Sequence, residues 1–277
     1  MIKMNENWTL GHVIKEDGIV TFKKMRQLTN IEWETYSKSL DDIYKIDEEI
    51  ALFHMIYINY IDFDQYMKYI INSLHEGPSP QSKVKTHVNN LNCKLNNFLS
   101  SIKLFLDHFE RRLKDEYGKK SKEIQLFKNE TSRLYDEYFS YRFLYHLRNY
   151  IQHRNVAISK LEIHENEYNI SLSIALNRKK LLSDYRWKND VKKDLITQND
   201  YIEIFPLMSE MLDNLKELTK LLIKEEIIKI KSSLNFIINL INEIGNPGAI
   251  LMQRNGDKLN YSEFPLEVIH FINYIIN

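Results

Sequence analysis

Hydrophobic residues recur along most of this chain at the spacing of an α-helix. The most regular pattern covers residues 82–117, where apolar side chains alternate at intervals of three and four: Val84, Val88, Leu91, Leu95, Phe98, Ile102, Phe105, Phe109 and Leu113. A second helical pattern covers residues 121–153 and contains neither glycine nor proline. Gly118 suits the position just past the first helix, and Ser121 suits the N-cap of the second. Because the connection is so short, we expect two long antiparallel helices side by side.

Further helical patterns flank this pair on both sides. They predict helices over residues 30–44, 47–74, 187–197, 206–244 and 266–276. Thr29 or Asn30 is the expected N-cap of the first, and Asp47 that of the second. The longest of these helices is expected to break near residues 224–226. The turn sequence Gly77-Pro78-Ser79-Pro80 stops a helix, and we take it as a domain boundary.

Short stretches of alternating hydrophobic and polar residues predict β-structure in three places. They are a hairpin around residues 16–18, a two-stranded excursion at about residues 160–176 and a hairpin around residues 254–257. The sequence therefore predicts a mainly α protein in three sections. These are an N-terminal helical section with a short hairpin (residues 1–78), a helical domain that carries the β excursion (residues 82–245), and a C-terminal hairpin with a short helix (residues 246–277).

The composition narrows the range of functions. The 38 basic and 38 acidic side chains give a formal net charge of zero, whereas proteins that coat nucleic acid non-specifically carry excess positive charge. Cys93 is the single cysteine, so the sequence offers no intrachain disulfide framework and indicates a reducing compartment. The N-terminal residues lack the apolar core of a signal peptide, and no apolar run approaches about 18 residues. We therefore expect a soluble, cytoplasmic protein with no membrane partner.

The candidate site lies in residues 143–155, FLYHLRNYIQHRN, at the end of the second long pattern. The last turns of this helix are apolar nearly all the way round, which is typical of a buried helix. Arg148, Asn149 and His153 are the polar exceptions. Since a buried polar group must be paired or used, these three residues are the candidate functional residues.

This run resembles the signature of the HEPN superfamily. The shared features are an arginine, a polar residue directly after it and a histidine five positions on, at the end of the last long helix of an antiparallel pair. The superfamily consists of all-α domains, many of which are metal-independent endoribonucleases. The resemblance covers about residues 82–153 and the helix that returns later. It implies a HEPN-like helical bundle that acts on RNA without metal or cofactor, as a toxin or antiviral defence effector, with an antitoxin or other defence-system protein as a possible partner.

The resemblance also implies a role for each residue. RNA cleavage without a metal needs a base, an acid and positive charge for the transition state. His153 would be the base or acid, Arg148 would stabilise the charge by holding phosphate oxygens, and Asn149 would orient groups by hydrogen bonds. Further RNA contacts are expected from a neighbouring histidine and from basic side chains nearby: His146, Lys119, Lys120, Lys122 and Arg154.

The geometry of the pair, taken together with the resemblance, implies a homodimer. Five residues correspond to about 140° around a straight helix, so Arg148 and His153 do not share a face. In HEPN nucleases the corresponding helices of two subunits meet, and each contributes half of a composite cleft. A homodimer would also explain why an apolar helix carries polar residues.

Three alternatives stay open. In the first, Arg148 and His153 are ordinary buried polar groups, satisfied by the carboxylates of Asp136 and Glu137 or by backbone carbonyls. In the second, the chain is a catalytically inactive helical scaffold or regulatory subunit that uses the same helix only to dimerise. In the third, it is an RNA-binding module without turnover.

Overall fold

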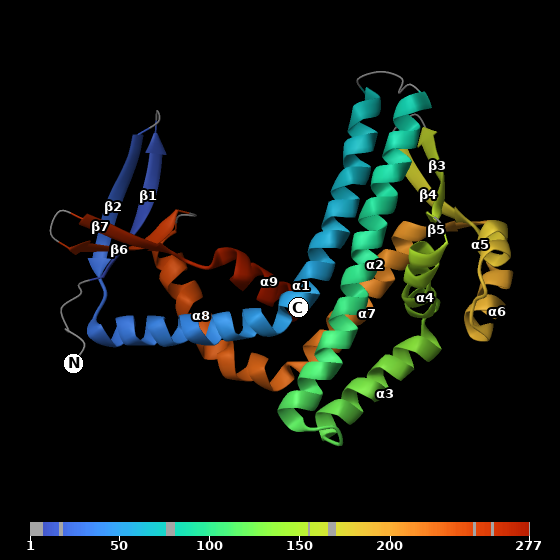
Figure 1. Ribbon diagram of the computed structural model, residues 1–277. Coiled ribbons are helices and arrows are strands. Elements are labelled where there is room, and N and C mark those ends of the chain that lie inside the picture. Colours follow the sequence, from blue (N-terminus) through green and yellow to red (C-terminus); the bar gives the residue numbers. More distant parts are fainter. Residues whose placement is uncertain are drawn as a thin grey trace. The chain divides into compact units, whose positions relative to one another are not determined.

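A computed structural model describes residues 8–16, 19–75, 81–154, 156–165, 170–245, 248–255 and 258–276, most of them helical (Figure 1). The chain divides into two compact units. Its two ends, Met1–Ile50 and Ile223–Asn277, form the first unit, and Ala51–Leu222 forms the second. These divisions differ from the boundaries expected at residues 78 and 245. Both divisions fall where no glycine or proline cluster marks the sequence, one of them inside a continuous helix.

The helices confirm the mainly α prediction. They are α1 (Asn30–His75), α2 (Gln81–Tyr117), α3 (Lys122–Glu137), α4 (Phe139–His153), α5 (Arg178–Asp184), α6 (Asn189–Thr197), α7 (Ile204–Leu222), α8 (Lys224–Ile244) and α9 (Leu266–Ile276). The predicted helix ends at Ser121 and Gly118 are confirmed. The Ser121 side chain accepts a hydrogen bond from the Ile124 amide, and Gly118 has a positive φ of 89°. The expected break near residues 224–226 lies at Ile223.

Two predicted boundaries are wrong. The helices expected over residues 30–44 and 47–74 are the single helix α1, and Asp47 lies inside it. No glycine or proline interrupts that stretch, and the buried side chains Ile43, Ile46 and Ile50 continue the helical spacing through it. The single helix expected over residues 121–153 breaks at Tyr138, whose backbone is extended.

The first unit contains a four-stranded antiparallel sheet built from both chain ends. Its order is β2 (Ile19–Gln27), β1 (Thr9–Glu16), β6 (Ala249–Asn255) and β7 (Lys258–Glu263). Both predicted hairpins are confirmed as strand pairs, although their turn residues lie outside the described part of the chain. The pairing of β1 with β6, with Leu10 opposite Leu251, joins them into one sheet. A Cβ at Gly11 would lie 2.4 Å from the backbone oxygen of Lys23 in β2, so the irregular pairing of β1 with β2 at this point requires glycine.

An ion-pair cluster links strand β2 to two helices of the first unit. Arg26 donates to Glu32 in the first turn of α1 at 2.8 Å and to Glu243 in α8 at 2.5 Å. Glu32 also accepts from the Thr29 amide, and its own amide donates to the Thr29 hydroxyl, which forms a capping box and confirms Thr29 as the N-cap. The rings of Trp8 and Trp33 stack beside this cluster at 4.7 Å.

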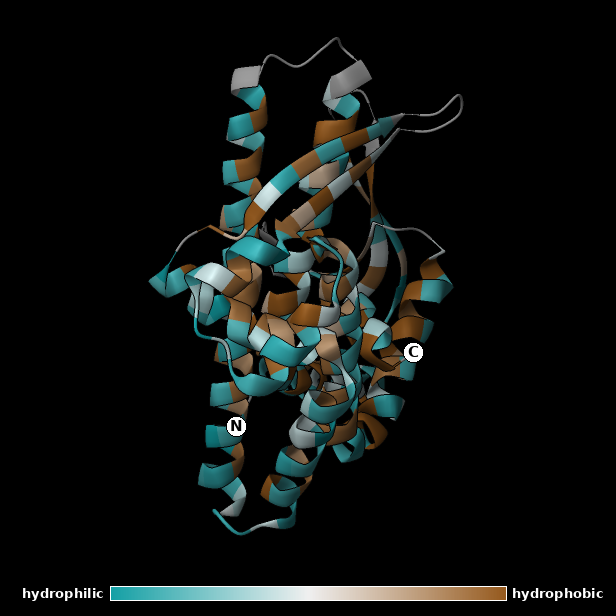
Figure 2. Ribbon diagram, turned by 90° about the vertical axis from the view of Figure 1, so that its right-hand side faces the viewer, coloured by the Kyte–Doolittle hydropathy of each residue, from teal (hydrophilic) through white to brown (hydrophobic). Residues whose placement is uncertain are grey.

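The second unit is a helical bundle. The part of α1 from residue 51 onward runs antiparallel to α2, with Tyr66 hydrogen-bonded to His87 and Asp62 ion-paired with Lys94 (Figure 1). Helix α3 folds back onto α2. Helix α4 packs against α2, α3 and α7, and α7 also packs against α3. In several helices, hydrophobic residues gather along one side and hydrophilic residues along the other (Figure 2). The expected antiparallel helical pair is therefore present, as α2 with α3.

A three-stranded sheet interrupts the bundle between α4 and α7. The predicted excursion is the hairpin of β3 (Ile158–Glu165) and β4 (Ile170–Asn177), and β5 (Tyr201–Glu203) adds a third strand beside β4. Helices α5 and α6 lie in the chain between β4 and β5. Within the described ranges of the chain, no helix combines the length and the hydropathy needed to cross a lipid bilayer.

Candidate functional site

Arg142 stabilises the break that separates α3 from α4. At the break, the carbonyls of Tyr135 and Asp136 lose the helical amides that would otherwise pair with them. The guanidinium of Arg142 donates to these two carbonyls at 2.5 and 2.6 Å. It also donates to the carboxylate of Asp194 in α6 at 2.9 Å. The side chain therefore replaces the missing backbone bonds and attaches the start of α4 to α6.

Helix α4 is buried within its own chain, which confirms the expectation drawn from its apolar surface. Phe143, Leu147 and Tyr150 are at most 1% exposed. Trp187, in the segment before α6, packs on α4 with its ring 5.7 Å from that of Phe143 and 5.8 Å from that of Tyr150. The apolar sides of α4 are thus covered inside one protomer, so the need to cover them is not a reason for dimerisation.

Asn92 in α2 fixes the chain just beyond the end of α4. Its side-chain oxygen accepts hydrogen bonds from the amides of Ala157 and Ile158 at 3.0 and 2.9 Å. Its amide nitrogen donates to the carbonyls of Val88 and Ile158 at 2.9 and 3.3 Å. Asn92 is 5% exposed, so these four bonds lie in the core.

Arg148 has no ionic partner among the described residues. Its side chain is half-buried, and its Nε is shielded from water without a hydrogen-bond partner in that part of the chain. The alternative in which Asp136 and Glu137 satisfy it is wrong. Glu137 pairs with Arg133 at 2.6 Å, and it is Arg142 that donates to the backbone carbonyl of Asp136. Because an unpaired buried donor is costly, the Nε of Arg148 is a donor that the fold holds without a partner among the described residues.

His153 is the last residue of α4, and its side chain is exposed. Gln152 and Arg154 beside it are also exposed, whereas Asn149 is half-buried. Helix α4 is unbroken from Arg148 to His153, so the two side chains leave the helix about 140° apart and about 7.5 Å apart along its axis. Within one protomer they therefore point in different directions.

His146 is placed differently from the other candidates. It is 7% exposed, its Nε2 lies 3.3 Å from the Tyr135 hydroxyl, and the rings of Tyr135 and Tyr145 meet it edge-on. Burial, and to a smaller extent the charge of Lys188, lowers the pKa of His146 below its ordinary value. The neutral imidazole is therefore the favoured form, and His146 packs inside the bundle.

The three candidate lysines lie far from His153. Lys119 and Lys120 are exposed in the connection between α2 and α3, and Lys122 is exposed at the start of α3. Lys103 lies opposite Tyr145, and Asn92 lies opposite Ala157, so the antiparallel register places His153 near residue 96 of α2. Lys119 is then about 35 Å further along that helix. A single cleft in one protomer cannot include both groups.

No protein-family model matches the chain, and neither the curated proteins nor the solved structures contain a significant match.

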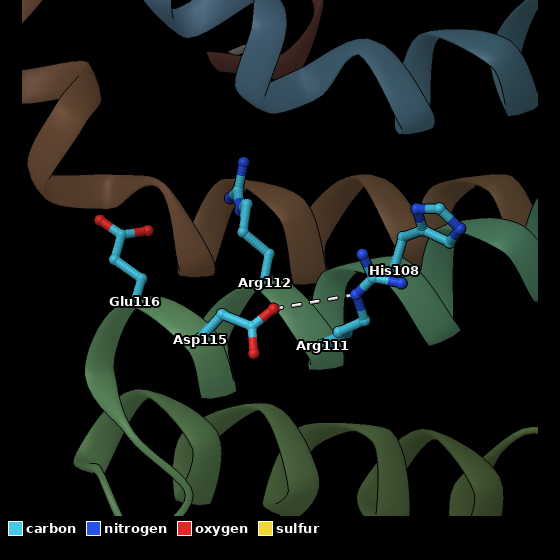
Figure 3. Close-up of a pocket in the computed structure, with 5 residues that line it drawn as sticks. All are labelled: His108, Arg111, Arg112, Asp115 and Glu116. Carbon is cyan, nitrogen blue, oxygen red and sulfur yellow. Dashed lines mark ion pairs between the residues drawn. The ribbon is translucent and has the colours of Figure 1, made fainter.

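A second charged surface lies near the C-terminal end of α2 (Figure 3). A shallow pocket of about 430 Å³ is lined by His108, Arg111, Arg112, Asp115 and Glu116, all from this one helix. Arg111 pairs with Asp115 at 3.8 Å, one turn further along. Opposite charges alternate here, so the surface offers an anion no net attraction, and we interpret it as a solvated helix end.

The described residues contain no group of three or more side chains arranged to hold a metal ion. The two carboxylates of the sequence Asp62-Phe63-Asp64 are used in ion pairs, with Lys94 and Lys68. Asn92 and Arg142, which position the two ends of α4, carry no signal in the sequence. Their partners are backbone groups or side chains from distant parts of the chain, and no local spacing identifies such pairs.

Proposed function

We propose that the protein is a metal-independent endoribonuclease of HEPN type that acts as a toxin or antiviral defence effector. The observation that carries this proposal is Arg148, a cation held half-buried, without an ionic partner among the described residues, five residues before the exposed His153. A structural arginine in such a place would be paired with a carboxylate. An arginine that binds phosphate oxygens would have no carboxylate partner in the free protein.

The two side chains supply the chemistry that the reaction needs. The 2'-hydroxyl of RNA attacks the adjacent phosphorus, and the 5'-oxygen of the next nucleotide leaves. His153 takes the proton from the attacking hydroxyl or gives one to the leaving oxygen. Arg148 holds the non-bridging oxygens while negative charge builds up on them. Asn149, half-buried beside Arg148, orients the phosphate or the imidazole by hydrogen bonding. The product is a 2',3'-cyclic phosphate.

The site is completed by a second copy of the chain. Arg148 and His153 point away from each other along one α4, so one protomer cannot place both on one phosphate. In a two-fold symmetric dimer, the exposed end of one α4 faces the same end of its partner. Gln152, His153 and Arg154 are exposed there and are free to form that contact and to receive RNA.

The test compares the wild type with Arg148→Ala and His153→Ala on mixed cellular RNA in excess EDTA. Matched controls are Arg111→Ala and His164→Ala, which remove an exposed arginine and an exposed histidine elsewhere in the second unit. Only the wild type and the two controls should cut RNA, and the products should carry 2',3'-cyclic phosphate ends. Each variant is first checked for an unchanged fold and dimer.

Other outcomes favour the alternatives. RNA binding without cleavage by the wild type would indicate an RNA-binding module. Neither binding nor cleavage would leave a catalytically inactive scaffold or dimerisation subunit. Equal cleavage by the wild type and both site variants would remove Arg148 and His153 from the mechanism.

A further inference from the structure

A polar cavity of about 370 Å³ lies among α2, α3 and α4, at the opposite end of α4 from His153. Its lining includes Glu110 from α2, Asp136 from α3, Tyr141 and Tyr145 from α4, and Lys188 from the segment before α6. The volume is within the range of pockets that hold small organic ligands. Tyr141 and Tyr145 precede His153 by about 18 and 12 Å along α4, so the cavity is separate from the proposed catalytic groups.

Tyr141 contributes a hydroxyl group to this lining. The side chain is 3% exposed, yet its hydroxyl makes no hydrogen bond with any described residue. Burial raises the pKa of Tyr141 well above its ordinary value, and the neighbouring Tyr145 adds to the effect, so the hydroxyl stays a neutral donor. The hydroxyl is not among the buried polar atoms that lack a partner, so it is accessible, and an acceptor atom on a bound ligand would take the place of a water there.

Carboxylates supply acceptors on the same cavity. Asp136 has no ionic partner for its side chain among the described residues. Glu110 is half-buried and is paired with Lys114 at 2.8 Å, which leaves acceptor positions on the carboxylate. Lys188 and the Tyr141 hydroxyl are among the donors of the lining. The rings of Tyr135 and Tyr145 also line the space and offer flat apolar surfaces. The cavity therefore combines flat surfaces, a carboxylate and nearby donors.

We propose that this cavity binds a guanine base. Guanine carries two adjacent N–H donor groups, N1–H and the N2 amino group, which match the two oxygens of one carboxylate. Its O6, next to N1, accepts a hydrogen bond from the Tyr141 hydroxyl or the Lys188 ammonium group. Proteins read unstacked bases in this way, by hydrogen bonds to the Watson–Crick edge and by stacking on aromatic side chains. Adenine, cytosine and uracil do not present two adjacent donors beside an acceptor in this order.

The guanine can belong to a free nucleotide or to an RNA strand, and both sources use the same contacts. Binding of a free nucleoside needs no cleavage, so this proposal stands or fails separately from the proposed nuclease activity. If RNA is the source, the bound base lies a few nucleotides from the phosphate at His153.

The experiment titrates the full-length protein with guanosine, inosine, adenosine, cytidine and uridine by calorimetry. Guanosine should bind saturably, and inosine, which lacks the N2 amino group, should bind about tenfold more weakly. Tyr141→Phe and Asp136→Asn should each weaken guanosine binding by about tenfold while keeping the wild-type melting temperature. Asp115→Asn, a matched carboxylate change on α2 outside this cavity, should bind guanosine like the wild type.

Two results would overturn the proposal. One is the absence of saturable guanosine binding up to about 1 mM, where the free energy of binding is about −4 kcal/mol. The other is binding that does not distinguish the bases or does not respond to Tyr141→Phe and Asp136→Asn. A second titration, of guanosine 5'-monophosphate against the trinucleotide ApGpA, identifies the source. Tighter binding of the trinucleotide indicates RNA, and equal or weaker binding indicates a free nucleotide.

Discussion

The side chain of Asn92 and the backbone of Ile158 bond each other in both directions. Asn92 accepts from the Ile158 amide at 2.9 Å and donates to its carbonyl at 3.3 Å. The pair reproduces the bonding of two adjacent strands, and it lies five residues beyond His153, the last residue of α4. We therefore expect the position of the proposed catalytic histidine to depend on Asn92, a buried residue of α2.

Replacing Asn92 should affect both stability and activity. Asn92→Ala leaves the buried amides of Ala157 and Ile158 without partners, which should lower the free energy of unfolding by about 2–3 kcal/mol. Cleavage of RNA should fall further than the unfolded fraction accounts for, because the end of α4 is released. Denaturant unfolding followed by circular dichroism measures the first effect, and cleavage rates at a temperature where the variant is folded measure the second.

Asn97→Ala is the matched control for this change. Asn97 lies on α2, one and a half turns further on, and is exposed, so its loss should change stability by no more than about 0.5 kcal/mol. If Asn92→Ala were as stable and active as this control, the four hydrogen bonds would have no role in holding the end of α4.

The helical spacing in the sequence predicts the helices of the bundle because each has a buried stripe of its own. Phe98, Phe105 and Phe109 are buried in α2 as their spacing requires. The break at Tyr138 has no such local cause. It depends on Arg142 and on Asp194, which is far away in the sequence, so no pattern in residues 121–153 could reveal it.

The candidate site could be predicted only in part. The sequence correctly indicated that α4 is buried, since its residues are apolar on almost every side. It could not distinguish Arg142, whose side chain bonds the helix break and Asp194, from Arg148, whose Nε has no partner among the described residues. Both are arginines on the same helix. It also could not separate the two histidines. His146 is buried beside Tyr135, whereas His153 is exposed at the end of the helix.

Stability of the second unit should decrease when His146 is forced to accept a proton. Its pKa is lowered below the ordinary value of 6.5, chiefly by burial. As the pH falls below 6.5, the unfolded chain takes up the proton before the folded chain does, so the stability present at higher pH is lost. Melting temperatures at pH 7.5 and 5.5 measure this loss. In His146→Gln the decrease should be smaller, whereas the exposed His164→Gln should keep the wild-type dependence.

The first unit should lose stability in a more acidic range. Hydrogen bonds from Arg26, followed by that from the Thr29 amide, lower the pKa of Glu32 from 4.5 to about 2. The stabilisation is complete above pH 4.5 and is lost as the pH falls towards 2. Because both side chains are partly exposed, we expect about 1 kcal/mol after allowance for solvent screening. Glu32→Gln keeps the capping box but removes the charge, so it should lose this amount at pH 7 and show a flatter acid dependence. Unfolding of Glu34→Gln, an exposed neighbour on α1, should follow the wild type.

Mixing two inactive variants tests whether the proposed site is shared between protomers. Arg148→Ala and His153→Ala each lack one group in every copy, so neither homodimer should cleave RNA. If each cleft combines Arg148 of one protomer with His153 of its partner, a mixed dimer contains one intact cleft. Random exchange of equal amounts makes half of the dimers mixed, so the mixture should regain about a quarter of the wild-type activity.

The measurement is the cleavage rate after subunits have been unfolded and refolded together, with the same two proteins refolded separately as the control. No regained activity in a mixture shown to contain mixed dimers would mean that each cleft does not form from one arginine and one histidine of different protomers.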